Sequence, residues 1–180
     1  MLQRLTLVGY RACGKSTVGR LVAKRLDWPF IDADSVLEQR LGCGIAAFFA
    51  SHGEPAFRDE EARSLAEILG KPGRFVLATG GGCVLRQENR GILRAKGGLV
   101  VYLAARAALL QERLRRHDGN RPSLTGAPVA DEVERLLTLR EPFYREVAHA
   151  VVDADQSVES LATYLAGIVE NSSTTEQNPI

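Results

Sequence analysis

Short apolar runs alternate along the chain with longer segments in which apolar residues recur at helical spacing. The short runs, which span three to five residues, are typical of buried strands. The sequence predicts strands at residues 5–8, 29–31, 75–78, 99–103 and 150–152. It predicts helices at residues 15–26, 35–41, 45–50, 57–69, 86–95, 109–114, 131–147 and 158–169. Because parallel neighbours need crossover connections, this alternation indicates an α/β protein whose parallel sheet is covered by helices on both faces.

Two segments do not sustain this periodicity. Residues 117–128 are rich in Gly, Pro, Asn, Asp and Ser, which predicts an exposed loop. From Asn171 onward the chain is polar and has little to bury, so a disordered tail is expected at 171–180. The length of 180 residues fits one domain, which we place at 1–170.

The net charge of the chain is too small for its electrostatic field to attract a polyanion. The chain has 23 Lys and Arg against 22 Asp and Glu, a formal net charge of +1, so we expect neither nucleic acid nor membrane as a partner. No apolar run approaches a membrane span, and the first residues do not resemble an export signal. Three cysteines without CxxC spacing suit free thiols. A cytoplasmic monomer is the expectation.

A phosphate-binding motif follows the first expected strand. Gly9 to Ser16 read GYRACGKS and fit G-x-x-x-x-G-K-[ST] between a strand and a helix. Glycines let consecutive backbone N–H groups surround phosphate oxygens, Lys15 neutralises the β- and γ-phosphates, and the Ser16 hydroxyl ligates magnesium (Mg²⁺). The motif therefore predicts a nucleoside triphosphate site, and the alternative is an ordinary glycine-rich turn. Cys13 lies at the start of a helix, a position that makes thiols reactive, so it is also a candidate for oxidation.

Two carboxylates end the second expected strand. If the chain is still extended there, Asp32 and Asp34 point to the same face. Beside a phosphate loop, one can hold Mg²⁺ through water while the other accepts a proton from an alcohol. The alternative is that one of them caps a helix starting at Ser35.

Two arginines are candidates for binding an acidic acceptor. Arg58 and Glu61 are neighbours on one helix face, and Arg140 lies in a later helix. Two guanidinium groups that reach one pocket would fork onto a carboxylate, whereas the alternative for Arg58 and Glu61 is a surface ion pair.

Three glycines and a loop arginine complete the candidate site. Gly80 to Gly82 follow a buried strand, which favours either close approach by another group or positive φ, and a plain turn is the alternative. Arg121 lies in a segment, about 112–127, that we expect to act as a lid, closing over the phosphates and excluding water. Since the carboxyl ends of parallel strands meet at one edge of a sheet, these residues should gather there with the phosphate loop.

The ordered set of motifs resembles the shikimate kinase family from about residue 5 to residue 165. The segments that carry the resemblance are Gly9–Thr17, Asp32–Asp34, Phe57–Glu61, Thr79–Gly82, Asn120–Gly126 and Arg140–Ala148. The resemblance implies a three-layer α/β/α P-loop kinase fold with a five-stranded parallel sheet in the order 2-3-1-4-5. It also implies transfer of the ATP γ-phosphoryl group to the 3-hydroxyl of shikimate, in the chorismate pathway of aromatic amino acid biosynthesis.

The resemblance also implies a role for each matching residue. Lys15, Asp34 and Arg121 are expected to be catalytic. The residues expected to bind shikimate are Asp34, Arg58, Gly80, Gly81 and Arg140, with Glu61 orienting Arg58. Those expected to contact ATP are Ala12, Cys13, Gly14, Lys15, Ser16, Thr17 and Arg121. The Mg²⁺ ligands are expected to be Ser16 and Asp32, directly or through water. Arg113 or Arg116 is expected to stack on adenine.

Two positions depart from the family pattern. Ala12 replaces a glycine in the phosphate loop, which carries a cost if the residue has positive φ. Asp155 replaces a threonine and adds a negative charge near the expected adenine pocket. Two other functions remain open at this point, namely a gluconate kinase-like enzyme and a non-catalytic shikimate sensor, and a turnover assay separates the sensor from an enzyme.

Overall fold

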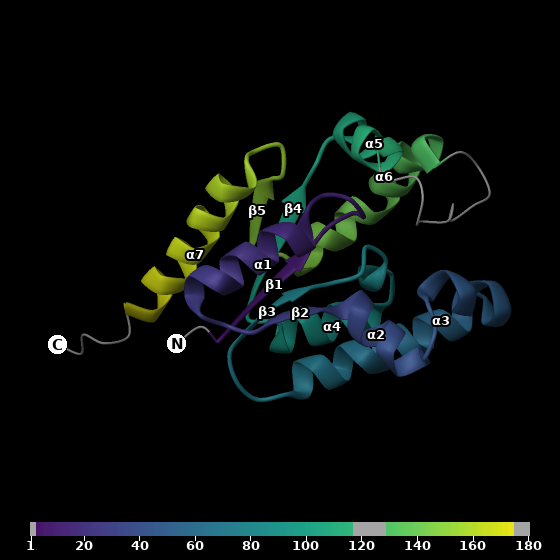
Figure 1. Ribbon diagram of the computed structural model, residues 1–180, viewed down its shortest axis with the longest axis horizontal. Helices are drawn as coiled ribbons and strands as arrows, with labels where there is room; N and C mark the ends of the chain where they lie inside the picture. Colours follow the sequence, from purple (N-terminus) through teal and green to yellow (C-terminus); the bar gives the residue numbers. More distant parts are fainter. Residues whose placement is uncertain (1–2, 117–128, 175–180) are drawn as a thin grey trace.

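The computed structural model describes residues 3–116 and 129–174. Within them, one parallel sheet has the strand order β2-β3-β1-β4-β5 (Figure 1). The strands are β1 (Arg4–Val8), β2 (Phe30–Asp32), β3 (Phe75–Ala78), β4 (Leu99–Ala104) and β5 (Ala150–Asp153). The α/β fold and its strand order are thereby confirmed.

Helices cover both faces of this sheet (Figure 1). They are α1 (Lys15–Leu26), α2 (Ala33–Leu41), α3 (Ile45–Gly70), α4 (Gln87–Lys96), α5 (Ala107–Arg116), α6 (Val129–Val147) and α7 (Val158–Thr174), with a short 3₁₀ turn, η1 (Cys83–Leu85). On one face, Val101 and Leu103 of β4 join the core formed with α1, α5 and α7. On the other face, Val100 and Tyr102 join the core formed with α3, α4 and the end of α6. This alternation along β4 is the pattern of a strand buried on both faces.

The long helix that follows α2 differs from expectation at its kink. A single helix, α3, spans the two predicted at 45–50 and 57–69, but Gly53 has φ 77° and ψ 172°, which is not helical. Two helical segments therefore meet at Gly53, since its positive φ is readily available only to glycine. The expectation of two segments holds, although they adjoin without a loop.

The end of the chain needs correction, whereas the expected lid stays a prediction. Helix α7 continues to Thr174, so residues 171–174 are helical and not part of a tail. The first part of the expected lid, residues 112–116, belongs to α5. The rest of that segment, including Arg121, lies outside the described residues. None of the helices described in 3–116 and 129–174 combines the length and apolar character needed to cross a bilayer.

Candidate active site

The phosphate loop joins β1 to α1 and wraps around its own lysine. Gly9 and Gly14 have φ of 147° and 105°, and a Cβ on Gly9 would lie 2.8 Å from the Leu103 carbonyl oxygen. Lys15 is only 8% exposed, and its Nζ donates to the carbonyl oxygens of Gly9 and Tyr10, each at 2.9 Å. Gly14 caps α1 without a side chain, so the first N–H groups of the helix face the loop. This is a ready anion site.

Ala12 adopts the left-handed conformation, with φ 64°. For a residue with a Cβ this conformation costs about 1–2 kcal/mol. The departure from the family glycine therefore strains the loop.

Replacing Ala12 with glycine should relieve this strain. We expect Ala12→Gly to raise the free energy of unfolding by about 0.5–1 kcal/mol, because the relief exceeds the entropic cost of glycine in the unfolded chain. Urea denaturation measures the change. Ala66→Gly, at an exposed position in α3, is the control and should lower stability by about 1 kcal/mol. Equal destabilisation by both changes would contradict the strain.

Asp32 links the end of β2 to the phosphate loop. Its Oδ2 accepts a hydrogen bond from the Ser16 hydroxyl at 2.6 Å, and its Oδ1 accepts one from the Asp34 N–H at 3.1 Å. Asp32 is thus the N-cap of α2, which begins at Ala33. The prediction that Asp32 and Asp34 share a face of an extended strand is wrong, because Asp34 already lies in the first helical turn. The capping alternative is correct for Asp32, and the helix begins at Ala33, two residues earlier than predicted.

The Ser16 and Asp32 pair has the chemistry of a Mg²⁺ site. Both side chains present oxygen ligands beside the phosphate loop, and Mg²⁺ prefers oxygen ligands and keeps several waters. Among the described residues, no group of three or more His, Cys, Asp and Glu could hold a metal. The residues fit a cation that takes its other ligands from water and phosphate.

Each of the three glycines at Gly80 to Gly82 lies close to groups from other parts of the chain. A Cβ on Gly80 would lie 2.7 Å from Asp34 Oδ1 and 3.0 Å from Glu61 Oε1. One on Gly81 would lie 2.9 Å from the Arg11 backbone nitrogen, and one on Gly82 would lie 2.5 Å from Arg58 Nη1. None of the three glycines has positive φ. Close approach, and not backbone conformation, is therefore the reason for glycine here.

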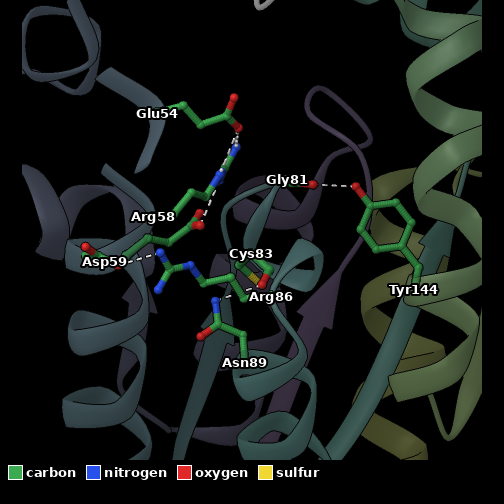
Figure 2. Close-up of polar contacts among 9 residues, drawn as sticks. Glu54, Arg58, Asp59, Gly81, Cys83, Arg86, Asn89 and Tyr144 are labelled. Atoms are coloured by element: carbon green, nitrogen blue, oxygen red, sulfur yellow. Dashed lines mark hydrogen bonds and ion pairs between the residues drawn. The ribbon is translucent and has the colours of Figure 1, made fainter. Parts of the chain in front are cut away.

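Arg58 is held by two carboxylates. Its Nη1 donates to Glu61 Oε2 at 2.7 Å, while Nε and Nη2 donate to Glu54 Oε1 at 3.2 and 3.1 Å (Figure 2). Arg58 is 8% exposed and Glu61 is also buried, so the surface ion pair alternative is wrong. Burial raises the pKa of Glu61, as does the nearby charge of Asp34, while Arg58 opposes the rise.

Arg58 and Arg140 line the same cavity, as expected. Arg140 is 6% exposed, and the cavity has a volume of about 200 Å³. Its other lining residues are Phe49, Glu54, Leu85, Leu136 and Leu139. Two guanidinium groups in a small, largely apolar cavity suit one small acid.

A larger cleft of about 840 Å³ contains the phosphate loop. Asp34, Thr79 and Gly81 also line it, so the cleft includes residues that follow β1, β2 and β3. The remaining lining residues are Arg11, Ala12, Cys13, Gly14, Lys15, Ser16, Thr17, Val18, Arg113, Leu114, Arg116, Ala154, Gln156, Val158 and Leu161. The predicted phosphate and acceptor residues within the described chain therefore lie in this cleft or in the arginine cavity, except Asp32 and Gly80, which contact Ser16 and Asp34.

The two candidate adenine arginines, Arg113 and Arg116, also line the cleft. Arg113 donates to the carbonyl oxygens of Ala12, Cys13 and Ala154 at 3.3, 3.1 and 3.2 Å. Arg113 thus ties α5 to the phosphate loop and to the end of β5. Asp155 forms an ion pair with Arg106, so the charge of this family departure is partnered.

Sequence reasoning missed several contacts of the site. Glu54 was identifiable, because it lies four residues before Arg58 on a helix. Arg11 pairs with the buried Glu132 at 3.1 Å, and the Tyr144 hydroxyl donates to the Gly81 carbonyl (Figure 2). These last two contacts join distant parts of the chain and have no local signal.

The three thiols differ in accessibility. Cys43 is exposed, whereas Cys13 and Cys83 are buried, and burial raises the pKa of Cys83 to about 12. We therefore expect iodoacetamide at pH 8 to alkylate Cys43 alone in the folded protein and to leave any activity unchanged. Mass spectrometry of peptides locates the label. Modification of Cys13 with loss of activity would instead support the oxidation hypothesis.

The fold and the two adjoining sites define the class: a P-loop kinase with a small acceptor. The family model described as shikimate kinase matches residues 11–170. The chain therefore belongs to the shikimate kinase family, whose members are ATP-dependent phosphotransferases.

Curated relatives and solved structures agree with this assignment. A shikimate kinase of Nitratidesulfovibrio vulgaris is 47% identical over 157 residues, which is 86% of this chain and 89% of the relative. One of Pseudomonas syringae pv. syringae is 48% identical over 155 residues, 86% of this chain and 88% of the relative. The shikimate kinase of Acinetobacter baumannii, solved in complex with shikimate, has a TM-score of 0.89 at 35% identity and covers 97% of this chain and 96% of its own.

More distant structures share only the fold. A gluconokinase from Sinorhizobium meliloti has a TM-score of 0.64 at 22% identity and covers 98% of both chains. The likeness to this gluconokinase therefore shows a common fold.

Proposed function

We propose that this chain transfers the γ-phosphoryl group of ATP to the 3-hydroxyl of shikimate, giving shikimate 3-phosphate and ADP in the chorismate pathway. The observation that carries the proposal is the cavity in which Arg58 and Arg140 are both buried, next to the phosphate loop cleft. Shikimate is a small acid with neighbouring hydroxyls, and this cavity offers charge for the acid. The formal net charge of +1 supports a protein without nucleic acid or membrane partners, and we further propose a cytoplasmic monomer.

Acceptor binding divides between the arginines and the strand ends. Arg58 and Arg140 bind the carboxylate, because guanidinium groups can form paired hydrogen bonds to its two oxygens. Asp34 binds the hydroxyls, together with the backbone of Gly80 and Gly81. Glu61 Oε2 accepts a hydrogen bond from Arg58 Nη1 at 2.7 Å and thereby orients Arg58.

Donor binding uses the backbone and side chains of the phosphate loop. The N–H groups of residues 12–17 surround the phosphates, and Lys15 exchanges its carbonyl partners in the loop for phosphate oxygens. Ser16 and Asp32 would hold Mg²⁺, which supplies positive charge to the phosphates when bound. Arg116 or Arg113, which both line the cleft, contacts the adenine.

Asp34 has the catalytic role on the acceptor side. Its carboxylate accepts the proton of the 3-hydroxyl as the oxygen bonds to the γ-phosphorus, and the bond to the ADP oxygen breaks. Asp34 and Lys15 line the same cleft, which supports confinement of the acceptor oxygen together with the transferring group. This confinement is most of what phosphoryl transfer requires of a protein.

A coupled assay of ADP release tests the function. The purified chain is given ATP and Mg²⁺ with shikimate, gluconate, quinate or no acceptor. We expect ADP with shikimate only, and none after chelation of the metal. ADP with another acceptor would overturn the substrate, whereas shikimate binding by calorimetry without ADP release would favour a sensor.

A further inference from the structure

Tyr10 is a buried aromatic residue inside the phosphate loop. It follows Gly9 directly and is 1% exposed. The guanidinium carbon of Arg140 lies 5.6 Å from the centroid of its ring, and that of Arg11 lies 5.9 Å from it. Burial raises the pKa of Tyr10, and the nearby positive charges of Arg11 and Arg140 oppose this rise. Two cations thus lie within the range of cation–π attraction to one ring.

Arg58 and Arg140 are held in different ways. Arg58 forms ion pairs with Glu54 and Glu61. Among the side chains that the structure describes, at residues 3–116 and 132–172, no carboxylate forms an ion pair with Arg140, while the Tyr10 ring lies within cation–π range of it. A ring attracts the face of a guanidinium group, and this leaves the N–H groups along its edge available to a planar acid.

Helix α6 is attached both to the phosphate loop and to the loop of Gly80 to Gly82. Glu132, Leu136, Arg140 and Tyr144 follow one another at four-residue steps and are all buried. Glu132 pairs with Arg11 of the phosphate loop, and the Tyr144 hydroxyl donates to the carbonyl oxygen of Gly81, in the loop that follows β3. Arg140 lies between these two attachments along the helix, so its backbone is already placed, and its side chain remains to be oriented.

We propose that Tyr10 is a positioning residue for the acceptor. Its ring holds the face of Arg140 so that the guanidinium edge is presented to the carboxylate in the cavity. The proposal rests on the proposed function, in which Arg140 binds that carboxylate. It follows that a side chain of the phosphate donor loop sets the affinity for the acid and not only for the nucleotide.

Ring-retaining and ring-removing variants test the proposal. Tyr10→Leu should raise KM for shikimate about 10-fold, the size of effect expected from a desolvated cation–π contact, with KM for ATP changed less than twofold. Tyr10→Phe keeps the ring and should leave both KM values within twofold of the wild type. Phe143→Leu is the matched control, because it removes the ring under Arg90, at 4.5 Å, from the same helix. It should not change KM for shikimate.

A fluorinated ring tests the same point without altering the packing. Pentafluorophenylalanine at position 10 keeps the shape of phenylalanine but reverses the polarity of the ring face, so it should raise KM for shikimate as leucine does. An unchanged KM with the fluorinated ring, an equal rise in KM for ATP, or a Phe variant as poor as the Leu variant would overturn the proposal. Failure of the wild type to phosphorylate shikimate would instead overturn the proposed function, before any variant is compared.

Discussion

Asp34→Asn should reduce kcat with shikimate by about 10²–10⁴-fold, the range found when a positioned base is removed. Asparagine keeps the size of the side chain, which matters because Gly80 approaches Asp34 so closely. It still donates and accepts hydrogen bonds but cannot take the proton of the 3-hydroxyl. Steady-state kinetics measures the loss, and calorimetry should show that Kd for ATP stays within twofold.

Asp59→Asn provides a control for this substitution. Asp59 lies on α3 and pairs with Arg86 (Figure 2), away from the residues that line the cleft. Its carboxylate is half exposed, so the change should alter neither kcat nor KM. Turnover by Asp34→Asn at the wild-type rate would refute the role of Asp34 as base. Weakened ATP binding would show that its charge organises the phosphate loop instead.

Gly82→Ala should raise KM for shikimate about 100-fold. The new Cβ would lie 2.5 Å from Nη1, 2.7 Å from Nη2 and 2.8 Å from Cζ of Arg58. The end of an arginine can usually move aside, but this one is buried and paired with Glu61 and Glu54. Displacing it costs a buried charge-assisted contact, for which about 2–5 kcal/mol is typical. Initial-rate kinetics over a shikimate series measures the effect.

Gly91→Ala is the matched control for Gly82→Ala. Gly91 lies in α4, where an added Cβ meets nothing within 4 Å. This change should leave KM for shikimate unaltered and raise the free energy of unfolding by about 0.5–1 kcal/mol, because alanine favours a helix interior. If Gly82→Ala behaved in the same way, Arg58 would not be the group that binds the acceptor acid.

Much of this site follows from short-range sequence patterns. The phosphate loop motif, the i,i+3 spacing of Arg58 and Glu61, and the glycines after β3 each carry their signal within a few residues. Topology then brings them together, because parallel strands present their carboxyl ends at one edge. The glycines left close approach, positive φ and a plain turn open, and they did not indicate that Asp34, Arg11 and Arg58 are the groups that come close.

Other features depend on contacts that no local pattern contains. Arg11 and Glu132 are 121 residues apart, and Tyr10 meets Arg140 only because α6 lies along the phosphate loop. The boundary between β2 and α2 was misplaced for a local reason. Asp32 ends the strand and caps the helix with the same side chain, so there is no residue left to form a turn between them.

The kink at Gly53 separates two tasks along α3. Residues 45–52 contribute Phe49 to the wall of the acceptor cavity, whereas Arg58 and Glu61 belong to the segment after the kink, whose Leu65 and Ile68 pack in the core. If the enzyme were evolved in the laboratory to accept other substrates, substitutions in residues 45–52 would reshape the cavity wall and leave Arg58 and Glu61 in place. Substitutions after Gly53 would instead destabilise the fold, because this segment contributes to the core.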